Sequence, residues 1–448
     1  MRYKKSIFNI EVDKISDDRI LLYNSLTTAF GIMDKNTQEI YDNIERYTVE
    51  ESASADTIVT LAKNGFILDD SIDEPSMMKY FFNRNKYNNA KLSLTIAPTL
   101  NCNMDCPYCY EKKSNIRMSE ETIQNIIEFV KKKASRGIKS FNVAWYGGEP
   151  LLEKETIYFL SKVFIDLCKE NNIKYTSTIL TNGILLDKET AKRLAGECLV
   201  FSAQITIDGT EEIHNMRRRL LNNKNSFKII TDNIEEIKDI LNVYIRVNVD
   251  KNNLSDVENL INHLYESRKW DNRVSMNFSP VVNIEDLCVY DHGACFANTD
   301  FDTIQANLTK KLMDKRGIDT RNLYPNRQFL SCSALSANGF VIDPSGDLFK
   351  CWTDVGIKDR NVGNVKEGPK LNSNFTRWVL ADLPDKCRKC STLPFCQGGC
   401  LYDTVYSNKE PVCGYNLETY KQNLKKAYEL YSKANTNSNT NAQCVAAE

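Results

Sequence analysis

Histidine is scarce in this chain of 448 residues, which contains only His214, His263 and His292. Three imidazoles leave few candidates for a His-rich metal site or for a mechanism centred on a histidine base. An excess of charge is also lacking, because a net charge of -1 gives no sign of a basic face for nucleic acid. No apolar run is long enough to cross a membrane, and the N-terminal residues lack the apolar segment of a secretory signal. We therefore expect a cytoplasmic protein without nucleic-acid or membrane partners.

Cysteine, in contrast, is abundant, with 15 copies. Because the cytosol keeps thiols reduced, clustered cysteines there favour a metal or a metal cluster over a disulfide framework. The length suffices for two or three domains, and 42% hydrophobic with 26% charged residues is typical of a globular protein.

The middle of the chain alternates between strand-like and helix-like segments. Short apolar runs predict six strands, at 92–98, 140–147, 174–181, 202–208, 243–249 and 274–280. Amphipathic stretches lie between them, as at 119–135 and 154–170. This alternation favours a parallel sheet. Residues 91–285 thus predict an α/β fold, a partial (β/α)6 barrel similar to a TIM barrel, with its chemistry at the carboxyl ends of the strands.

The flanking segments differ from this core. Residues 1–75 contain two short strands and two helix-like stretches, which predict a winged-helix-like module. Residues 76–90 are polar and predict a linker, and residues 286–330 form a bridging region without a clear pattern. The C-terminal part predicts, in order, a cysteine-rich domain with seven cysteines, a helix and a disordered tail, at residues 331–420, 421–434 and 435–448.

A group of three cysteines follows the first predicted strand. The stretch TLNCNMDCPYCYEKK, residues 99–113, contains Cys102, Cys106 and Cys109. Thiolates at this spacing can bind three irons of a cubane [4Fe–4S] cluster and leave the fourth iron without a protein ligand. A structural zinc site would need a fourth Cys or His nearby, and none is close in the sequence.

This pattern, with an aromatic residue before the last cysteine, resembles that of the radical S-adenosylmethionine (SAM) enzymes. In that family the open iron binds SAM, and the aromatic residue lies near the adenine. GGEP, TNG, IDGT and RVN at or near later strand ends extend the resemblance over about residues 92–285. A simple turn also explains GGEP, and a structural ion pair also explains Arg246. The resemblance implies ten SAM-binding residues: Tyr108, Gly147, Gly148, Glu149, Pro150, Thr181, Asn182, Asp208, Arg246 and Asn248.

The downstream cysteines extend the resemblance. Four of them, in CRKCSTLPFCQGGC, could by themselves form a zinc knuckle. Together with the other three they resemble a SPASM domain, which carries auxiliary [4Fe–4S] clusters. The resemblance implies an outer cluster held by four residues, Cys387, Cys390, Cys396 and Cys413. It implies an inner cluster held by three, Cys332, Cys351 and Cys400.

One iron of the inner cluster remains without a ligand in this count. Three such clusters contain twelve irons, SAM takes one, and the motifs supply ten cysteines. Either Cys288 or Cys295 fills the remaining position, or the iron stays open and binds a substrate thiol. The other cysteines, Cys168, Cys198 and Cys444, are expected to be ordinary thiols.

The resemblance implies a maturase that cleaves SAM to a 5′-deoxyadenosyl radical and cross-links a Cys-containing precursor peptide, most simply through a thioether. Its partners would be that peptide and a low-potential electron donor such as flavodoxin or ferredoxin. Residues 1–75 resemble the peptide-recognition domains of such maturases, and a plain cap on the barrel is the alternative. Carbon–carbon cross-linking and another peptide or protein oxidation, as in sulfatase maturases, are the alternatives. Trp352 stands where those maturases carry an acidic base after the second SPASM cysteine. A zinc-binding module without catalysis is an alternative of another class, and the sequence assigns no catalytic side chain.

Overall fold

The structure is a computed structural model that describes residues 2–47, 54–111, 113–271, 273–282, 293–296, 298–316, 327–410, 413 and 417–436. The chain forms two compact units. Unit 1 contains residues 1–86, 319–332 and 381–448, and unit 2 contains residues 87–318 and 333–380. Among the described residues no helix is long and apolar enough to span a bilayer.

Unit 2 is built on one sheet whose strands lie in the order β13-β12-β10-β9-β8-β6-β14-β15. The six predicted strands are all present and parallel, as β6 (Lys91–Ile96), β8 (Ser140–Trp145), β9 (Lys174–Thr181), β10 (Val200–Thr206), β12 (Asn242–Val249) and β13 (Val274–Pro280). The C-terminal part adds β14 (Gly339–Ile342), parallel to β6, and β15 (Leu348–Phe349), antiparallel to β14. The predicted partial (β/α)6 barrel is therefore confirmed.

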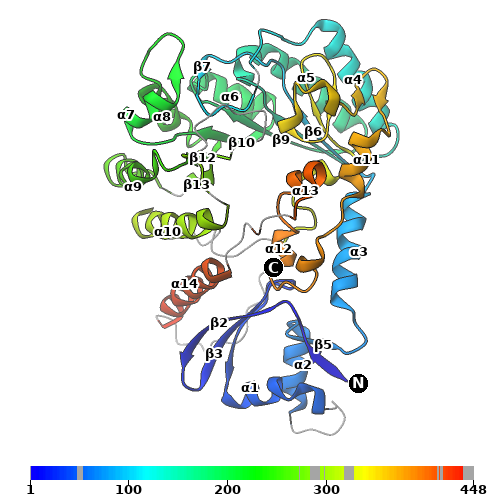
Figure 1. Ribbon diagram of the computed structural model, residues 1–448, viewed down its shortest axis with the longest axis vertical. Coiled ribbons are helices and arrows are strands. Elements are labelled where there is room, and N and C mark those ends of the chain that lie inside the picture. The colour runs from blue at the N-terminus through cyan, green and yellow to red at the C-terminus, as the bar shows by residue number, and fades with distance from the viewer. Residues whose placement is uncertain are drawn as a thin grey trace. The chain divides into compact units, whose positions relative to one another are not determined.

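Helices alternate with these strands, and Figure 1 shows them around the sheet. They are α4 (Glu120–Ala134), α5 (Lys154–Glu170), α6 (Lys188–Glu197), α7 (Glu211–Arg217), α8 (Ser226–Ile237), α9 (Leu254–Asn262) and α10 (Asn298–Arg316). Three of these helices begin at a residue whose side chain accepts a hydrogen bond from a backbone amide of the first turn, namely Ser119, Asp187 and Asn225. Two very short strands, β7 (Met104–Asp105) and β11 (Arg219–Leu220), pair outside the main sheet. The unit also contains α11 (Ser373–Leu380) and the pair β16 (Gly363–Asn364) and β17 (Gly368–Pro369).

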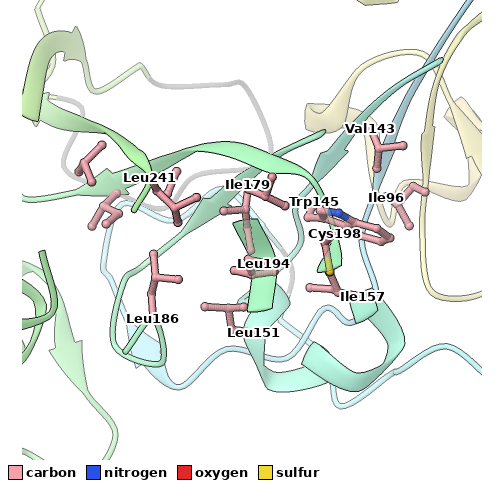
Figure 2. Close-up of a cluster of buried hydrophobic side chains, with 14 of the residues drawn as sticks. Ile96, Val143, Trp145, Leu151, Ile157, Ile179, Leu186, Leu194, Cys198 and Leu241 are labelled. Atoms are coloured by element: carbon pink, nitrogen blue, oxygen red, sulfur yellow. The ribbon is translucent and has the colours of Figure 1, made fainter. Parts of the chain in front are cut away.

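The core of unit 2 lies between the sheet and these helices. Figure 2 shows Trp145, Ile157 and Cys198 within this cluster, and all three are fully buried. Burial raises the pKa of Cys198 to about 11 and that of Cys168, on α5, also to about 11. Both side chains therefore stay neutral near pH 7 and pack as small apolar groups, as the sequence predicts.

Unit 1 contains a three-stranded antiparallel sheet of β2 (Asn9–Ser16), β3 (Arg19–Asn24) and β4 (Phe30–Asp34). One face packs on α1 (Lys35–Asp42) and α2 (Ala55–Lys63) through residues such as Leu22 and Ile58. The other face packs on Phe395 and on Leu424 of α14 (Leu417–Thr436). The remaining elements are β1 (Tyr3–Lys5), which pairs with β5 (Ile67–Asp69), and the helices α3 (Glu74–Lys86), α12 (Leu393–Cys396) and α13 (Tyr402–Ser407).

Two features of unit 1 differ from the sequence expectation. The predicted linker 76–90 is helical up to residue 86, because Met78, Phe82 and Lys86 recur every fourth residue and are buried. The Lys86 ammonium lies 4.7 Å from the centre of the Phe82 ring, and burial lowers its pKa to about 8. A third strand, β4, follows the two predicted ones. Most of the tail predicted at 435–448 lies outside the described residues, which end at residue 436, the last residue of α14.

Candidate active site

The cysteine loop begins directly after β6 and folds back on itself. The Leu100 amide donates to the Ile116 carbonyl at 3.1 Å, and the Ser114 amide donates to the Leu100 carbonyl at 3.2 Å. These contacts hold Cys102, Cys106 and Cys109 in one partly buried loop. Burial raises the pKa of Cys102 to about 11 and that of Cys109 to about 12, because a desolvated thiolate is unfavourable. Iron bound by these thiolates would supply the compensating positive charge.

The two glycines of GGEP lie against this loop. A Cβ atom at Gly147 would stand 2.4 Å from the Thr99 carbonyl oxygen, and one at Gly148 would stand 2.3 Å from that of Asn101. Real Cβ atoms do not approach backbone oxygens so closely, so only glycine fits. The Glu149 amide donates to the Asn101 carbonyl at 2.8 Å. The end of β8 is therefore fixed beside the cysteine loop.

Glu149 is fully buried and accepts three hydrogen bonds. They come from the Leu151 amide at 3.1 Å, the Thr181 hydroxyl at 2.6 Å and the Asn182 amide at 2.7 Å. Burial raises the pKa of this carboxyl, and the three donors oppose the rise. No ion pair to Glu149 occurs within the described part of the chain. A buried carboxylate oriented by donors is a suitable partner for the amino group of SAM.

Asn182 joins the end of β9 to the cysteine loop. Its Nδ2 lies 3.9 Å from the Cys102 sulfur and donates to Asn103 Oδ1 at 2.6 Å. Thr181 and Asn182 also donate to Glu149, so two predicted strand ends converge on one carboxylate. These contacts place TNG at the cysteine loop, where the resemblance implies SAM binding.

A second convergence surrounds Tyr108. Its hydroxyl donates to Asp208 Oδ2, and it accepts from Asn248 Nδ2 at 3.4 Å. Asp208 is fully buried, and its Oδ1 accepts from the Asn248 amide at 2.9 Å. The structure thus brings together three predicted residues from the cysteine loop, the end of β10 and β12.

Arg246 lines a cavity of about 310 Å³ formed by residues of β9, β10, β12 and β13. Its Nε donates to Asn248 Oδ1 at 2.8 Å. The cavity lining contains hydroxyl and amide groups and no carboxylate, so no structural ion pair for Arg246 is found there. The lining residues are Thr178, Ile179, Leu180, Ser202, Gln204, Tyr244, Ile245, Arg246, Asn277 and Ser279. An anion bound in this cavity would meet one cation.

Arg218, which the sequence analysis did not assign, is a buried cation beside the cysteine loop. Its Nη1 donates to the Tyr108 hydroxyl at 2.7 Å and lies 3.9 Å from Asp208 Oδ2. Burial raises the pKa of Cys106, and the Arg218 guanidinium opposes that rise. Arg218 similarly opposes the rise for Cys102 and Glu149. The three consecutive arginines of MRRRL are the only sequence signal for this residue. The sequence does not show which of the three is buried.

We expect Arg218→Gln to weaken SAM binding by about ten-fold, or ~1.4 kcal/mol. The substitution removes the cation that orients Tyr108 and partners buried Asp208. Equilibrium dialysis with radiolabelled SAM on the reconstituted enzyme measures the effect, and thermal unfolding checks the fold. Arg218→Lys should recover part of the affinity, and the exposed neighbour Arg219→Gln should retain all of it. Full affinity in Arg218→Gln would contradict this role.

Aromatic side chains link the cysteine loop to Cys351 within unit 2. The hydroxyls of Tyr110 and Tyr146 share a hydrogen bond, and the Tyr146 ring stacks on Trp352 at 5.5 Å. Burial raises the pKa of Tyr110, and negative charge at Cys351 adds to the rise, so these groups are neighbours. Burial also raises the pKa of Glu111 to about 7, although a hydrogen bond from Tyr146 acts to lower that pKa. The sequence analysis missed Tyr110, Glu111 and Tyr146, and only the aromatic flanking of Cys109 hints at them.

Four of the downstream cysteines lie near one another in unit 1. Burial raises the pKa of Cys396 to about 12, and negative charge at Cys387, Cys390 and Cys413 adds to the rise. The backbone between Cys396 and Cys400 is tight, since residues 397, 398 and 399 all have positive φ. The same unit contains Cys332 and Cys400. Burial raises the pKa of Cys400, and negative charge at Cys332 adds to the rise, so the two side chains lie near each other.

A single metal ion does not fit these groups directly. Among the described residues no three Cys, His, Asp or Glu side chains stand close enough to bind one ion. A cubane needs wider spacing, because each thiolate binds a different iron. Cys288 lies outside the described residues, whereas Cys295 is described and partly buried.

Comparisons with known proteins agree with this geometry. Residues 96–264 match the family model of the Radical SAM superfamily. The cysteine-type anaerobic sulfatase-maturating enzyme of Clostridium novyi (strain NT) is 27% identical over 345 residues, which are 71% of this chain and 89% of that protein. The radical SAM cyclopropyl synthase TigE of Paramaledivibacter caminithermalis is 25% identical over 334 residues, which are 67% of this chain and 66% of that protein.

Solved structures share the fold. The SAM-bound structure named anSMEcpe superposes with a TM-score of 0.55 at 20% identity and covers 77% of this chain and 98% of that chain. Streptococcus suis SuiB bound to SAM has a TM-score of 0.50 at 17% identity and covers 90% and 98%. Residues 96–264 therefore form a domain of the Radical SAM superfamily. The predicted resemblance to radical SAM maturases of the SPASM type is confirmed. A radical SAM domain uses a [4Fe–4S] cluster and SAM.

Proposed function

We propose that the enzyme cross-links a Cys-containing precursor peptide, by a thioether in the simplest case. The observation that carries the proposal is the convergence of the ends of β8, β9 and β10 on the cysteine loop through Glu149, Asn182 and Asp208. When bound, the cluster and SAM would supply an electron and a 5′-deoxyadenosyl radical able to take hydrogen from a peptide carbon. The surrounding side chains orient the cofactor and exclude water.

The residues present fit this cofactor. Cys102, Cys106 and Cys109 would hold the cluster, and Glu149 would bind the amino group of SAM. Thr181, Asn182, Asp208 and Asn248 offer hydroxyl, amide and carboxylate partners for the remaining polar groups. By resemblance, the other seven motif cysteines would hold two auxiliary clusters. The inner set of Cys332, Cys351 and Cys400 would leave one ligand position for a substrate thiol, and the auxiliary clusters would supply an acceptor for the surplus electron.

Similar proteins support a peptide or protein substrate. One matched structure is described as anSMEcpe with bound SAM and the Cp18Cys peptide, with a TM-score of 0.53 at 21% identity. The Clostridium novyi relative is named for the maturation of sulfatases, which makes formylglycine formation the second candidate. Trp352 opposes that candidate, since it follows Cys351 and stacks on Tyr146 where an acidic base is expected.

A groove in unit 1 supports peptide recognition by residues 1–75. Within the described residues β4 pairs on one side only, with β3, so its other edge can accept an extra strand. A cavity of about 250 Å³ runs along this edge, with Met33, Leu61 and Phe66 as apolar walls and Asp56 and Thr60 on α2. We propose that the leader of the precursor peptide adds to β4 and places an apolar side chain in this groove.

We expect Thr60→Trp to weaken binding of the precursor peptide by at least about ten-fold, because the larger side chain fills the groove. Cleavage of SAM should persist at the native rate, since the substitution lies in unit 1. Lys63→Trp is a matched control, because Lys63 is exposed on the same helix and does not line the groove. Fluorescence anisotropy with labelled peptide measures the affinity. Equal affinity in both variants would exclude the groove as the leader site.

The mass and thiol content of the modified peptide test the proposed function. A candidate Cys-containing precursor peptide is incubated anaerobically with reconstituted enzyme, SAM and dithionite, and then treated with iodoacetamide. A thioether predicts a loss of about two hydrogen masses per bond and one cysteine that no longer alkylates. The same mass loss with every cysteine alkylated indicates a carbon–carbon bond, and loss of the sulfur itself indicates formylglycine. An unchanged peptide would contradict the proposal.

A further inference from the structure

The face of the sheet that turns away from the buried core of unit 2 is polar. In β10 and β12 alternate residues such as Ile205 and Ile245 belong to that core. Their neighbours along each strand point to the other face, because successive side chains of a strand alternate. On that face the register pairs Gln204 with Tyr244, and Arg246 follows two residues later. All three of these side chains line the cavity of about 310 Å³.

Arg246 is the one charged residue among those that line this cavity. The six parallel strands contain no Asp or Glu, and their other two cations, Lys91 and Lys174, are the first residues of β6 and β9. The Nε of Arg246 donates to Asn248 Oδ1 at 2.8 Å. Within the described part of the chain its two terminal nitrogens have no hydrogen-bond partner and no carboxylate. This end of a guanidinium can hold a carboxylate through two parallel hydrogen bonds.

The carboxylates that follow β10 and β12 already have partners. Asp208 lies 3.9 Å from Arg218 Nη1, and Asp250 accepts from Arg217 Nη1 at 2.8 Å. Both carboxylates are fully buried, so each is held by the arginine beside it. Neither is left to neutralise Arg246, and the cavity is therefore suited to an anionic group of a ligand.

Hydrogen bonds join this cavity to the proposed SAM site. Asn248 accepts from Arg246 and donates from its Nδ2 to the Tyr108 hydroxyl at 3.4 Å, and Tyr108 directly precedes Cys109. The cavity volume lies within the range of about 300 to 1,000 Å³ that is usual for small-molecule sites. Tyr244 is 47% exposed and offers an aromatic surface for the carbon chain that carries an anion. A ligand bound here would therefore lie close to the cofactor.

We propose that this cavity binds a carboxylate of the precursor peptide and that Arg246 selects for it. The inference rests on the proposed function and adds that the enzyme requires an acidic peptide. The carboxylate belongs to an Asp or Glu side chain or to the C-terminus of the peptide, since both present the same group to a guanidinium. Its binding would fix the neighbouring peptide carbon beside the SAM site. A peptide without this carboxylate would leave the guanidinium unpaired, which is the physical basis of the selection.

The test measures the binding of three acetylated pentapeptide probes that each contain one cysteine. The first is an amide with one glutamate, the second is the amide with glutamine in its place, and the third has that glutamine and a free C-terminal carboxylate. Calorimetry is performed on the reconstituted native enzyme with saturating SAM. We expect at least one carboxylate probe to bind at least about ten-fold tighter than the neutral probe. The preferred probe shows whether the carboxylate is that of the side chain or that of the terminus.

Substitutions connect this preference to Arg246. Arg246→Gln should reduce it to less than about two-fold, and Arg246→Lys should retain part of it. Gln204→Glu should also abolish the preference, because it adds a carboxylate on the same face beside Arg246 and keeps the cation. Lys174→Gln is the matched control, since Lys174 is an exposed cation of the same sheet that does not line the cavity. Its preference should equal that of the native enzyme.

Three results would overturn the inference. The first is equal affinity of the native enzyme for all three probes. The second is a preference that persists in both Arg246→Gln and Gln204→Glu; a fall in SAM affinity in Arg246→Gln would then assign this cation to the carboxylate of SAM. The third is an equal loss of preference in Lys174→Gln, which would indicate an effect of overall charge. Because the probes are read by binding, failure of the proposed function is seen separately, as candidate precursor peptides that stay unmodified.

Discussion

Replacing Cys102, Cys106 and Cys109 together by alanine is expected to lower SAM cleavage by at least about 100-fold. The three thiolates are the proposed ligands of the first cluster, and without it no electron reaches SAM. The downstream cysteines should keep their iron, because Cys387, Cys390, Cys396 and Cys413 lie in the other unit. Liquid chromatography of 5′-deoxyadenosine measures the rate, and iron and sulfide analysis counts the clusters that remain.

Cys168→Ala is the matched control for this triple variant. Cys168 is buried on α5, far in sequence from the loop, so its loss should cost stability and leave the iron content unchanged. Production of 5′-deoxyadenosine by the triple variant at the native rate would contradict the assignment. Loss of all iron from the triple variant would contradict the separation of the two cysteine groups.

Replacing Cys400 by alanine is expected to lower cross-linked product by at least about 100-fold while SAM cleavage continues. Cys400 and Cys332 lie near each other in unit 1 and are proposed ligands of the inner auxiliary cluster. Loss of Cys400 would remove the proposed open iron position at which a substrate thiol would bind as a thiolate. Quantitative mass spectrometry of peptide and 5′-deoxyadenosine separates the two steps.

Cys295→Ala and Cys288→Ala are the informative companions. If the inner iron is open to substrate, both variants should form product at the native rate and keep the native iron content. Loss of product in either one would instead assign the fourth ligand to that cysteine. The thioether mechanism through an open iron would then be wrong.

The sheet of unit 2 was predictable because its strands carry their own signals. Residues 174–181, KYTSTILT, form β9 with the predicted bounds, and residues 154–170 form α5 with the predicted bounds. Both segments are bounded by turn residues and have clear apolar periodicity. Helix α3 was missed because its buried Met78 and Phe82 are embedded in a polar stretch, EPSMMKYFFNRNK. Strand β4 was missed because it contains Gly31 and only five residues.

The site was predictable to the extent that it follows strand ends. Residues after β6, β8, β9 and β10 share one edge of a parallel sheet, so their motifs meet there. Arg218 follows a short helix and not a strand, and its role depends on a fold that buries it beside Tyr108. Arg246 lies on a strand as predicted, but three residues before the end of β12, which places it in the cavity on the sheet. That the Arg246 side chain lines a cavity is visible only in three dimensions.

Transfer of deuterium from peptide to cofactor tests the central claim most directly. A precursor peptide deuterated at all of its carbon-bound positions, Cα included, is incubated anaerobically with reconstituted native enzyme, SAM and reductant. The proposed function predicts 5′-deoxyadenosine that gains one deuterium, in an amount equal to the cross-links formed. Unlabelled 5′-deoxyadenosine alongside modified peptide, or modified peptide without 5′-deoxyadenosine, would contradict it.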